Sequence, residues 1–100
     1  MNKFIQLLGL ATKAGKTVSG EFSVEQAVKK RSVELVIIAQ DASENTKKHF
    51  NDMCAYRKIP ILFACEKSEL GKCTGKNERA SVGVLDHGFA DKLISIIREV

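Results

Sequence analysis

The feature that most constrains the fold is the alternation of short strand-like runs with amphipathic helical stretches along 100 residues. Residues 34–39 and 61–65 are almost entirely apolar, which is typical of buried strands, and the first run predicts a central strand covered on both faces. A short strand is expected at residues 16–19 and a fourth strand at residues 80–86. Strands that alternate with helices predict an α/β fold in which helices cover both faces of a sheet.

The helices are predicted from apolar residues that recur every three or four positions. The first stripe consists of Phe4, Leu7, Leu8, Ala11 and Ala14. Gly15 follows it and is expected to end the helix in a left-handed conformation. A short helix is expected at residues 68–73. The stripe of a final helix consists of Phe89, Leu93, Ile96, Ile97 and Val100.

Two further helices are expected to begin near residues 21 and 41. Glu21 lies where the first of them presents its positive end, and Arg31 is expected to lay its stem along the apolar edge of that helix. Asp41 precedes Glu44 by three positions, a spacing that predicts a reciprocal cap at the start of the second.

Length and charge narrow the class of protein. One hundred residues form one domain, residues 1–100. No apolar run approaches the roughly 20 residues of a membrane helix, so no membrane association is expected. The apolar start has helical spacing and no cleavage site, and it is interpreted as the first helix of a mature, cytoplasmic protein. A net charge of +4 favours an anionic partner.

Catalytic, metal and cofactor sites are not expected. Cys54, Cys65 and Cys73 form no CxxC motif and are expected to be reduced and packed, while His49 and His87 lack the spacing of metal ligands. Cys73 and His87 could be imagined as a nucleophile and base, but nothing in the sequence places them together. Residues 9–17 end in Gly-Lys-Thr, yet the glycine spacing and the helical context do not fit a phosphate-binding loop.

Two loops are candidates for contacts with nucleic acid. Residues 19–23 join a strand to a helix, whose free amide groups suit phosphate oxygens and base edges. Residues 75–79 form a basic loop, and Lys29, Lys30 and Arg31 form a basic run. Each of these segments is equally compatible with a purely structural role, as a helix start, a connecting loop or a solvated helix end.

The whole chain resembles a known superfamily in a combination of motifs. Residues 20–39, GEFSVEQAVKKRSVELVIIA, are followed by Gln40 and Asp41, and residues 67–75, KSELGKCTG, are similar to an LGxxxG segment. The chain also carries LLGLA at residues 7–11 and an Asp-x-Gly-Phe-Ala segment at residues 86–90. These motifs are similar to those of the ribosomal proteins that bind kink-turns in RNA, the L-seven-Ae and L-thirty-e group, and especially of its small bacterial stand-alone members.

This resemblance implies a three-layer α/β/α sandwich with a mixed four-stranded sheet. It also implies RNA contacts from the turn at residues 19–23, the turn after residue 39 and the loop at residues 74–79. In that superfamily the first turn reads Gly-x-Asn-Glu-x-x-Lys. Here Phe22, Ser23 and Gln26 occupy the Asn, Glu and Lys positions, and only Gly20 is kept. Ser23 and Gln26 can still form hydrogen bonds, whereas Phe22 can stack on an unpaired base or pack inward as core.

The function expected from the sequence is therefore recognition of structured RNA without catalysis. The expected partner is a kink-turn or a related RNA, with ribosomal RNA and the ribosome as candidates, and DNA is not expected to bind. The alternative is a protein-interaction module on the same scaffold in ribosome assembly or stress signalling. The candidate RNA-binding residues are Gly20, Glu21, Phe22, Ser23, Gln26, Lys30, Asp41, Lys76, Asn77 and Arg79.

Overall fold

The computed structural model describes residues 2–98, and within them helices and strands alternate as the sequence predicts. In chain order the elements are α1 (Asn2–Lys13), β1 (Thr17–Ser19), α2 (Glu21–Lys29), β2 (Leu35–Ile38), α3 (Glu44–Arg57), β3 (Ile61–Phe63), α4 (Lys67–Cys73), β4 (Ser81–Val84) and α5 (His87–Arg98). Val100, the last position of the predicted stripe on α5, lies outside the described residues.

The four strands form a mixed sheet in the order β1-β4-β2-β3. Strand β4 is antiparallel to both β1 and β2, and β2 is parallel to β3. Every residue of β2 is buried, so the prediction of a central strand covered on both faces is confirmed. Strand β3 lies at the edge of the sheet, and its side chains are accordingly half-buried or exposed.

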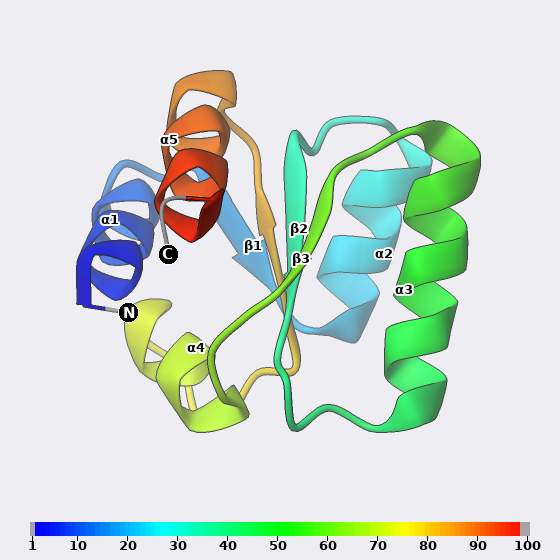
Figure 1. Ribbon diagram of the computed structural model, residues 1–100, viewed down its shortest axis with the longest axis horizontal. Coiled ribbons are helices and arrows are strands. Elements are labelled where there is room, and N and C mark those ends of the chain that lie inside the picture. The colour runs from blue at the N-terminus through cyan, green and yellow to red at the C-terminus, as the bar shows by residue number, and fades with distance from the viewer. Residues whose placement is uncertain (1, 99–100) are drawn as a thin grey trace.

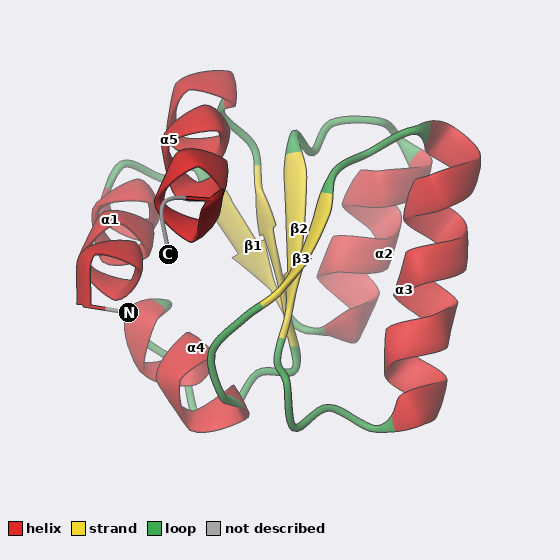
Figure 2. Ribbon diagram, viewed as in Figure 1, coloured by secondary structure: helices red, strands yellow, loops and turns green. Residues whose placement is uncertain are grey.

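Helices cover both faces of this sheet and complete three layers. Figure 1 shows α1, α4 and α5 on one face and α2 and α3 on the other, and Figure 2 shows the strands between them. Phe4 and Leu8 of α1 and Leu93 of α5 are fully buried on one side, and Phe50 of α3 is fully buried on the other. The predicted α/β/α sandwich is confirmed.

The first helix ends as the sequence predicts. Gly15 has a φ of 73°, the Gly15 amide donates to the carbonyl oxygen of Thr12 at 3.0 Å, and the Lys16 amide donates to that of Ala11 at 2.9 Å. This pair of bonds is the Schellman arrangement, in which a glycine adopts the left-handed conformation without strain.

The predicted reciprocal cap between Asp41 and Glu44 is wrong. Ser43 is the N-cap of α3, and its Oγ accepts the Thr46 amide at 3.1 Å. Asp41 instead accepts the Lys67 amide through Oδ1 at 2.8 Å, so it holds the start of α4 against the turn after β2.

A capping box does occur at α4. The Glu69 side chain accepts the Glu66 amide at 2.8 Å, while the Glu66 side chain accepts the backbone amide of Glu69. Sequence reasoning began this helix at residue 68 and missed the pair.

The expected position of Arg31 on the apolar edge of α2 is also wrong. Helix α2 ends at Lys29, and Arg31 lies beyond it, exposed, with a φ of 56°.

Candidate functional site

One edge of the sheet gathers the predicted contact segments. Strands β1, β2 and β3 run in one direction and β4 in the other, so the ends of the first three lie at the same edge of the sheet as the start of β4. The Gly20 amide donates to the Ser81 carbonyl oxygen at 3.1 Å, and the Ala39 amide donates to the Ala80 carbonyl oxygen at 2.9 Å. We call the surface formed by residues 20–23, 40–41 and 74–79 the loop edge.

The β1–α2 turn presents an uncapped helix start at this edge. Gly20 is the N-cap residue, with φ 93° and ψ 151°, and it has no side chain to accept an amide. The first helical bond runs from the Val24 amide to the Gly20 carbonyl oxygen at 3.0 Å, and a helix leaves the amides before that bond free. Phe22 is 76% exposed, so it is not part of the core, and Ser23 is exposed beside it.

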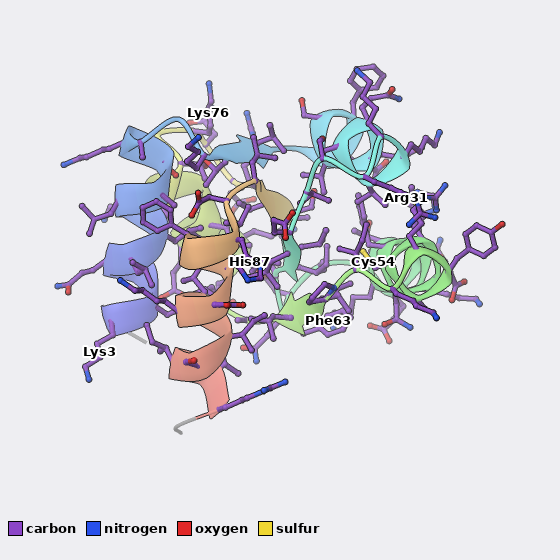
Figure 3. The ribbon with its side chains drawn as sticks, turned by 90° about the horizontal axis from the view of Figure 1, so that it is seen from above. Lys3, Arg31, Cys54, Phe63, Lys76 and His87 are labelled. Carbon is purple, nitrogen blue, oxygen red and sulfur yellow. The ribbon has the colours of Figure 1, made fainter. Side chains whose placement is uncertain are left out.

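The α4–β4 loop packs closely against α4. A Cβ atom at Gly71 would lie 1.6 Å from the carbonyl oxygen of Asn77, so only glycine fits beneath the loop. Thr74 is buried and donates from Oγ1 to the Leu70 carbonyl oxygen at 2.9 Å, while the Lys76 amide donates to the Gly71 carbonyl oxygen at 2.8 Å. Lys76 is exposed and projects away from the ribbon in Figure 3.

Arg79 links the loop to the turn. Its Nε atom lies 3.8 Å from the position of a Cβ atom on Gly20, and its Nη1 donates to the Glu78 carbonyl oxygen at 2.9 Å. Within residues 2–98, the buried Arg79 Nε and Ser81 Oγ have no hydrogen-bond partner. A buried polar atom without a partner is unfavourable, and both of these residues adjoin the uncapped start of α2.

Sequence reasoning missed Ser81. The residue is only 1% exposed, and its signal was a polar side chain next to Val82 at the start of an apolar strand.

The structure brings most of the predicted site residues together. Those within the loop edge are Gly20, Glu21, Phe22, Ser23, Asp41, Lys76, Asn77 and Arg79. Gln26 lies one turn further along α2 from Phe22 and is half-buried. Lys30 is the C-cap residue of α2, about 15 Å of helix away from Gly20, and belongs to the opposite end of the molecule.

The buried thiols are unsuited to nucleophilic chemistry at neutral pH. Burial, with a smaller contribution from the neighbouring carboxylate of Glu69, raises the pKa of Cys65 to about 11. Burial likewise raises the pKa of Cys54 to about 11. Cys73 and His87 do not contact each other but have other partners. Cys73 donates from Sγ to the Ile5 carbonyl oxygen at 3.6 Å. The His87 ring nitrogens lie 3.4 Å from a carboxylate oxygen of Glu34 and 3.1 Å from one of Asp91.

The described part of the chain shows no cluster of three or more His, Cys, Asp or Glu side chains placed to hold a metal ion. None of the helices within it is long and apolar enough to cross a membrane.

Comparison with known proteins identifies relatives over nearly the full length. The RNA-binding protein YlxQ of Bacillus subtilis is 42% identical over 95 residues, covering 95% of each chain. The solved structure of a Bacillus halodurans protein of unknown function is 41% identical, has a TM-score of 0.92, and aligns over 96% of this chain and 97% of its own. The Giardia lamblia 15.5kD RNA binding protein shares the fold, with a TM-score of 0.80 and 19% identity over 95% of this chain and 84% of its own.

The match to a family model also covers nearly the whole chain. Residues 2–94 match the model described as the Ribosomal protein L7Ae/L30e/S12e/Gadd45 family. The resemblance noted in the sequence motifs is therefore confirmed, and the chain belongs to this family.

Proposed function

We propose that this protein binds structured RNA through the loop edge and catalyses no reaction. The observation that carries the proposal is the uncapped start of α2, which lies beside Arg79 and the exposed ring of Phe22. The family's description as ribosomal proteins and the name of the YlxQ relative support RNA as the partner. A target in ribosomal RNA would place the protein in the cytoplasm and in contact with the ribosome.

Phosphate groups fit the positive part of this edge. The free amides of the first turn of α2 and the positive end of its dipole attract anions. Lys76 adds an exposed cation, and the half-buried Arg79 adds a second positive charge beside Gly20. These contacts position an RNA backbone without reading its sequence.

Bases are recognised by the side chains of the turn. Phe22 offers an exposed ring on which an unpaired base can stack. Ser23 and Gln26 follow at helical spacing and can form hydrogen bonds with base edges, and the exposed Asn77 faces the same edge from the loop. We propose that the target is a kink-turn or a related bent RNA, recognised by stacking in place of the polar pair that the superfamily pattern has at these positions.

Competition between RNAs tests this proposal. A labelled kink-turn RNA is bound to the protein, and unlabelled kink-turn, plain RNA duplex or DNA duplex of equal length is added at fixed salt. The kink-turn is expected to displace the label at much lower concentration than either duplex. Equal displacement by the plain RNA duplex would contradict recognition of the kink-turn.

A matched pair of variants locates the binding site. Ser23→Ala combined with Gln26→Ala is expected to remove most of the preference for the kink-turn, whereas Ser95→Ala on the exposed side of α5 leaves it unchanged. If the protein binds none of these RNAs, and this result does not change as salt is lowered, a protein-interaction role on the same scaffold replaces RNA binding, because phosphate contacts strengthen steeply at low salt.

A further inference from the structure

A second basic surface lies at the opposite end of the molecule from the loop edge. Helices α2 and α3 run side by side in the same direction, and both end there (Figure 1). We call this surface the helix-end patch. It consists of Lys29, Lys30, Arg31, Tyr56, Arg57 and Lys58.

The two helix ends are joined by a direct contact. The Arg31 Nη1 donates to the carbonyl oxygen of Arg57 at 3.2 Å, and Figure 3 shows Arg31 between α2 and α3. The basic run that the sequence assigned to one helix end is therefore continued by Arg57 and Lys58 from the other, although these residues are far apart in the chain.

Both helices end in Schellman turns that have a cation where glycine is favoured. At α2 the amides of Arg31 and Ser32 donate to Val28 and Ala27, and at α3 those of Lys58 and Ile59 donate to Ala55 and Cys54. Arg31 and Lys58 occupy the left-handed position of each turn, with φ values of 56° and 58°. Glycine is the residue that this position prefers, so chain reversal alone does not account for two long cationic side chains.

The positive charge of the patch exceeds what its surroundings neutralise. Lys29 pairs with Glu25 at 3.2 Å. In the described chain no carboxylate lies within ion-pair distance of Lys30, Arg31, Arg57 or Lys58. Each helix end supplies only about half a negative charge, so an unbalanced positive surface remains.

An exposed aromatic ring completes the surface. Tyr56 is 81% exposed, and the Arg57 guanidinium lies 5.4 Å from the centre of its ring. A tyrosine beside a guanidinium is a flat platform on which an unpaired base can stack, flanked by cations that suit the adjoining phosphates.

We propose that the helix-end patch is a second RNA-binding surface, through which one molecule holds two RNA segments at its opposite ends. The choice of RNA over an acidic protein rests on the stacking pair of Tyr56 and Arg57. The patch shares no residue with the loop edge, so its RNA contacts do not depend on the proposed binding at that edge.

A charge-matched pair of triple variants tests the patch. Lys30→Glu/Arg31→Gly/Lys58→Gly removes three of the five cations of the patch and places glycine where the two turns favour it. The control, Lys3→Glu/Lys92→Gln/Arg98→Gln, lowers the net charge by the same amount as the patch variant. Its three side chains lie on α1 and α5 and are exposed. Each protein is titrated at constant low salt with a labelled RNA hairpin that has an unpaired loop and no kink-turn.

The patch variant is expected to lose about tenfold or more in affinity for the hairpin, and the control less than about threefold. Tyr56→Ala is expected to lose about fivefold or more in affinity, because it removes the ring on which a base would stack. Its fold should be unaffected, because Tyr56 is largely exposed. Kink-turn binding is measured in parallel on all variants, and thermal melting confirms that each is folded.

Equal losses in the two triple variants would overturn the proposal, since they would report net charge alone. Unchanged hairpin binding by the patch variant would also overturn it and would favour an acidic protein as the partner of this surface. A wild-type protein that binds the hairpin through the patch but shows no preference for the kink-turn would instead refute the proposed function and leave the second surface standing.

Discussion

The β1–α2 turn and the α4–β4 loop lie side by side at the loop edge but are built in opposite ways. Gly20 is required by backbone conformation, because its φ of 93° and ψ of 151° suit glycine, although there is room for a Cβ atom. Gly71 lies within α4 and does not have a positive φ, but there is no room for a Cβ atom, because Asn77 packs directly on it. The β1–α2 turn therefore depends on the backbone torsion angles of Gly20, and the α4–β4 loop depends on close packing against Gly71.

This difference separates positioning from recognition. The packed loop fixes the backbone around Lys76 and Arg79, so its cations have a defined place. The turn leaves Phe22 and Ser23 exposed, and their identity can change without altering the core. Two of the three departures from the superfamily pattern, Phe22 and Ser23, lie in this turn.

The largest expected effect comes from Gly71→Ala. The added methyl group would overlap Asn77, so the loop must move or α4 must shift. We expect the free energy of unfolding to fall by about 3 kcal/mol, at the upper end of overpacking effects, as measured by urea denaturation. Gly9→Ala on α1 is the control, because nothing lies near its Cβ position and alanine is expected to stabilise that helix. A stable Gly71→Ala protein would show that the loop is not held by this contact.

Gly20→Ala is expected to have a smaller effect. The nearest atom to its Cβ position is Arg79 Nε at 3.8 Å, so the change strains the backbone without a clash. We expect a loss of about 1–2 kcal/mol in the free energy of unfolding, because this combination of φ and ψ is essentially restricted to glycine. RNA affinity should fall as well, because the first turn of α2 is displaced. If Gly20→Ala were as damaging as Gly71→Ala, the contrast between torsion and packing would not hold.

Phe22→Ala should affect binding and leave stability unchanged. The ring is 76% exposed, so the free energy of unfolding should change by less than about 0.5 kcal/mol. Loss of stacking should weaken RNA binding by about 1–3 kcal/mol in a gel-shift titration. Leu10→Ala is the control, because Leu10 is also a largely exposed apolar residue but lies on α1. If Phe22→Ala and Leu10→Ala bound RNA with equal affinity, this result would contradict a stacking role for Phe22.

Lys76→Gln is expected to have the smallest effect. Lys76 is exposed on the α4–β4 loop, and its removal should weaken binding to all RNAs by a similar factor. The slope of log affinity against log salt should flatten by about one, since one phosphate contact is lost. An unchanged slope would mean that this side chain does not contact phosphate.

The sequence predicted the elements well because the information they need is local. The apolar spacing of α1, the glycine that ends it and the unbroken run of β2 each act within a few residues. The prediction for Asp41 was wrong, because its hydrogen-bond partner is distant in the sequence. Asp41 was predicted to cap α3, but it accepts the amide of Lys67, a residue 26 positions away that the sequence does not place beside it.

The candidate site was predicted in part for the same reason. The turn at Gly20 was recognisable in the sequence as a strand-to-helix turn, but Ser81 was missed. A serine at the start of a strand is not distinctive in the sequence, and only the fold places it beside Gly20. Lys30 shared a short sequence segment with the turn, yet the length of α2 carries it to the other end of the molecule.

By itself the sequence determined the alternation of helices and strands, the buried central strand and the family, because periodicity and motifs are properties of the chain. Only the tertiary structure decided which polar groups meet. Antiparallel pairing of β4 with β1 and β2 brings distant turns into one loop edge, and the side-by-side packing of α2 and α3 gathers two basic helix ends into one patch. Charge and exposed aromatic rings acquire a function through that packing.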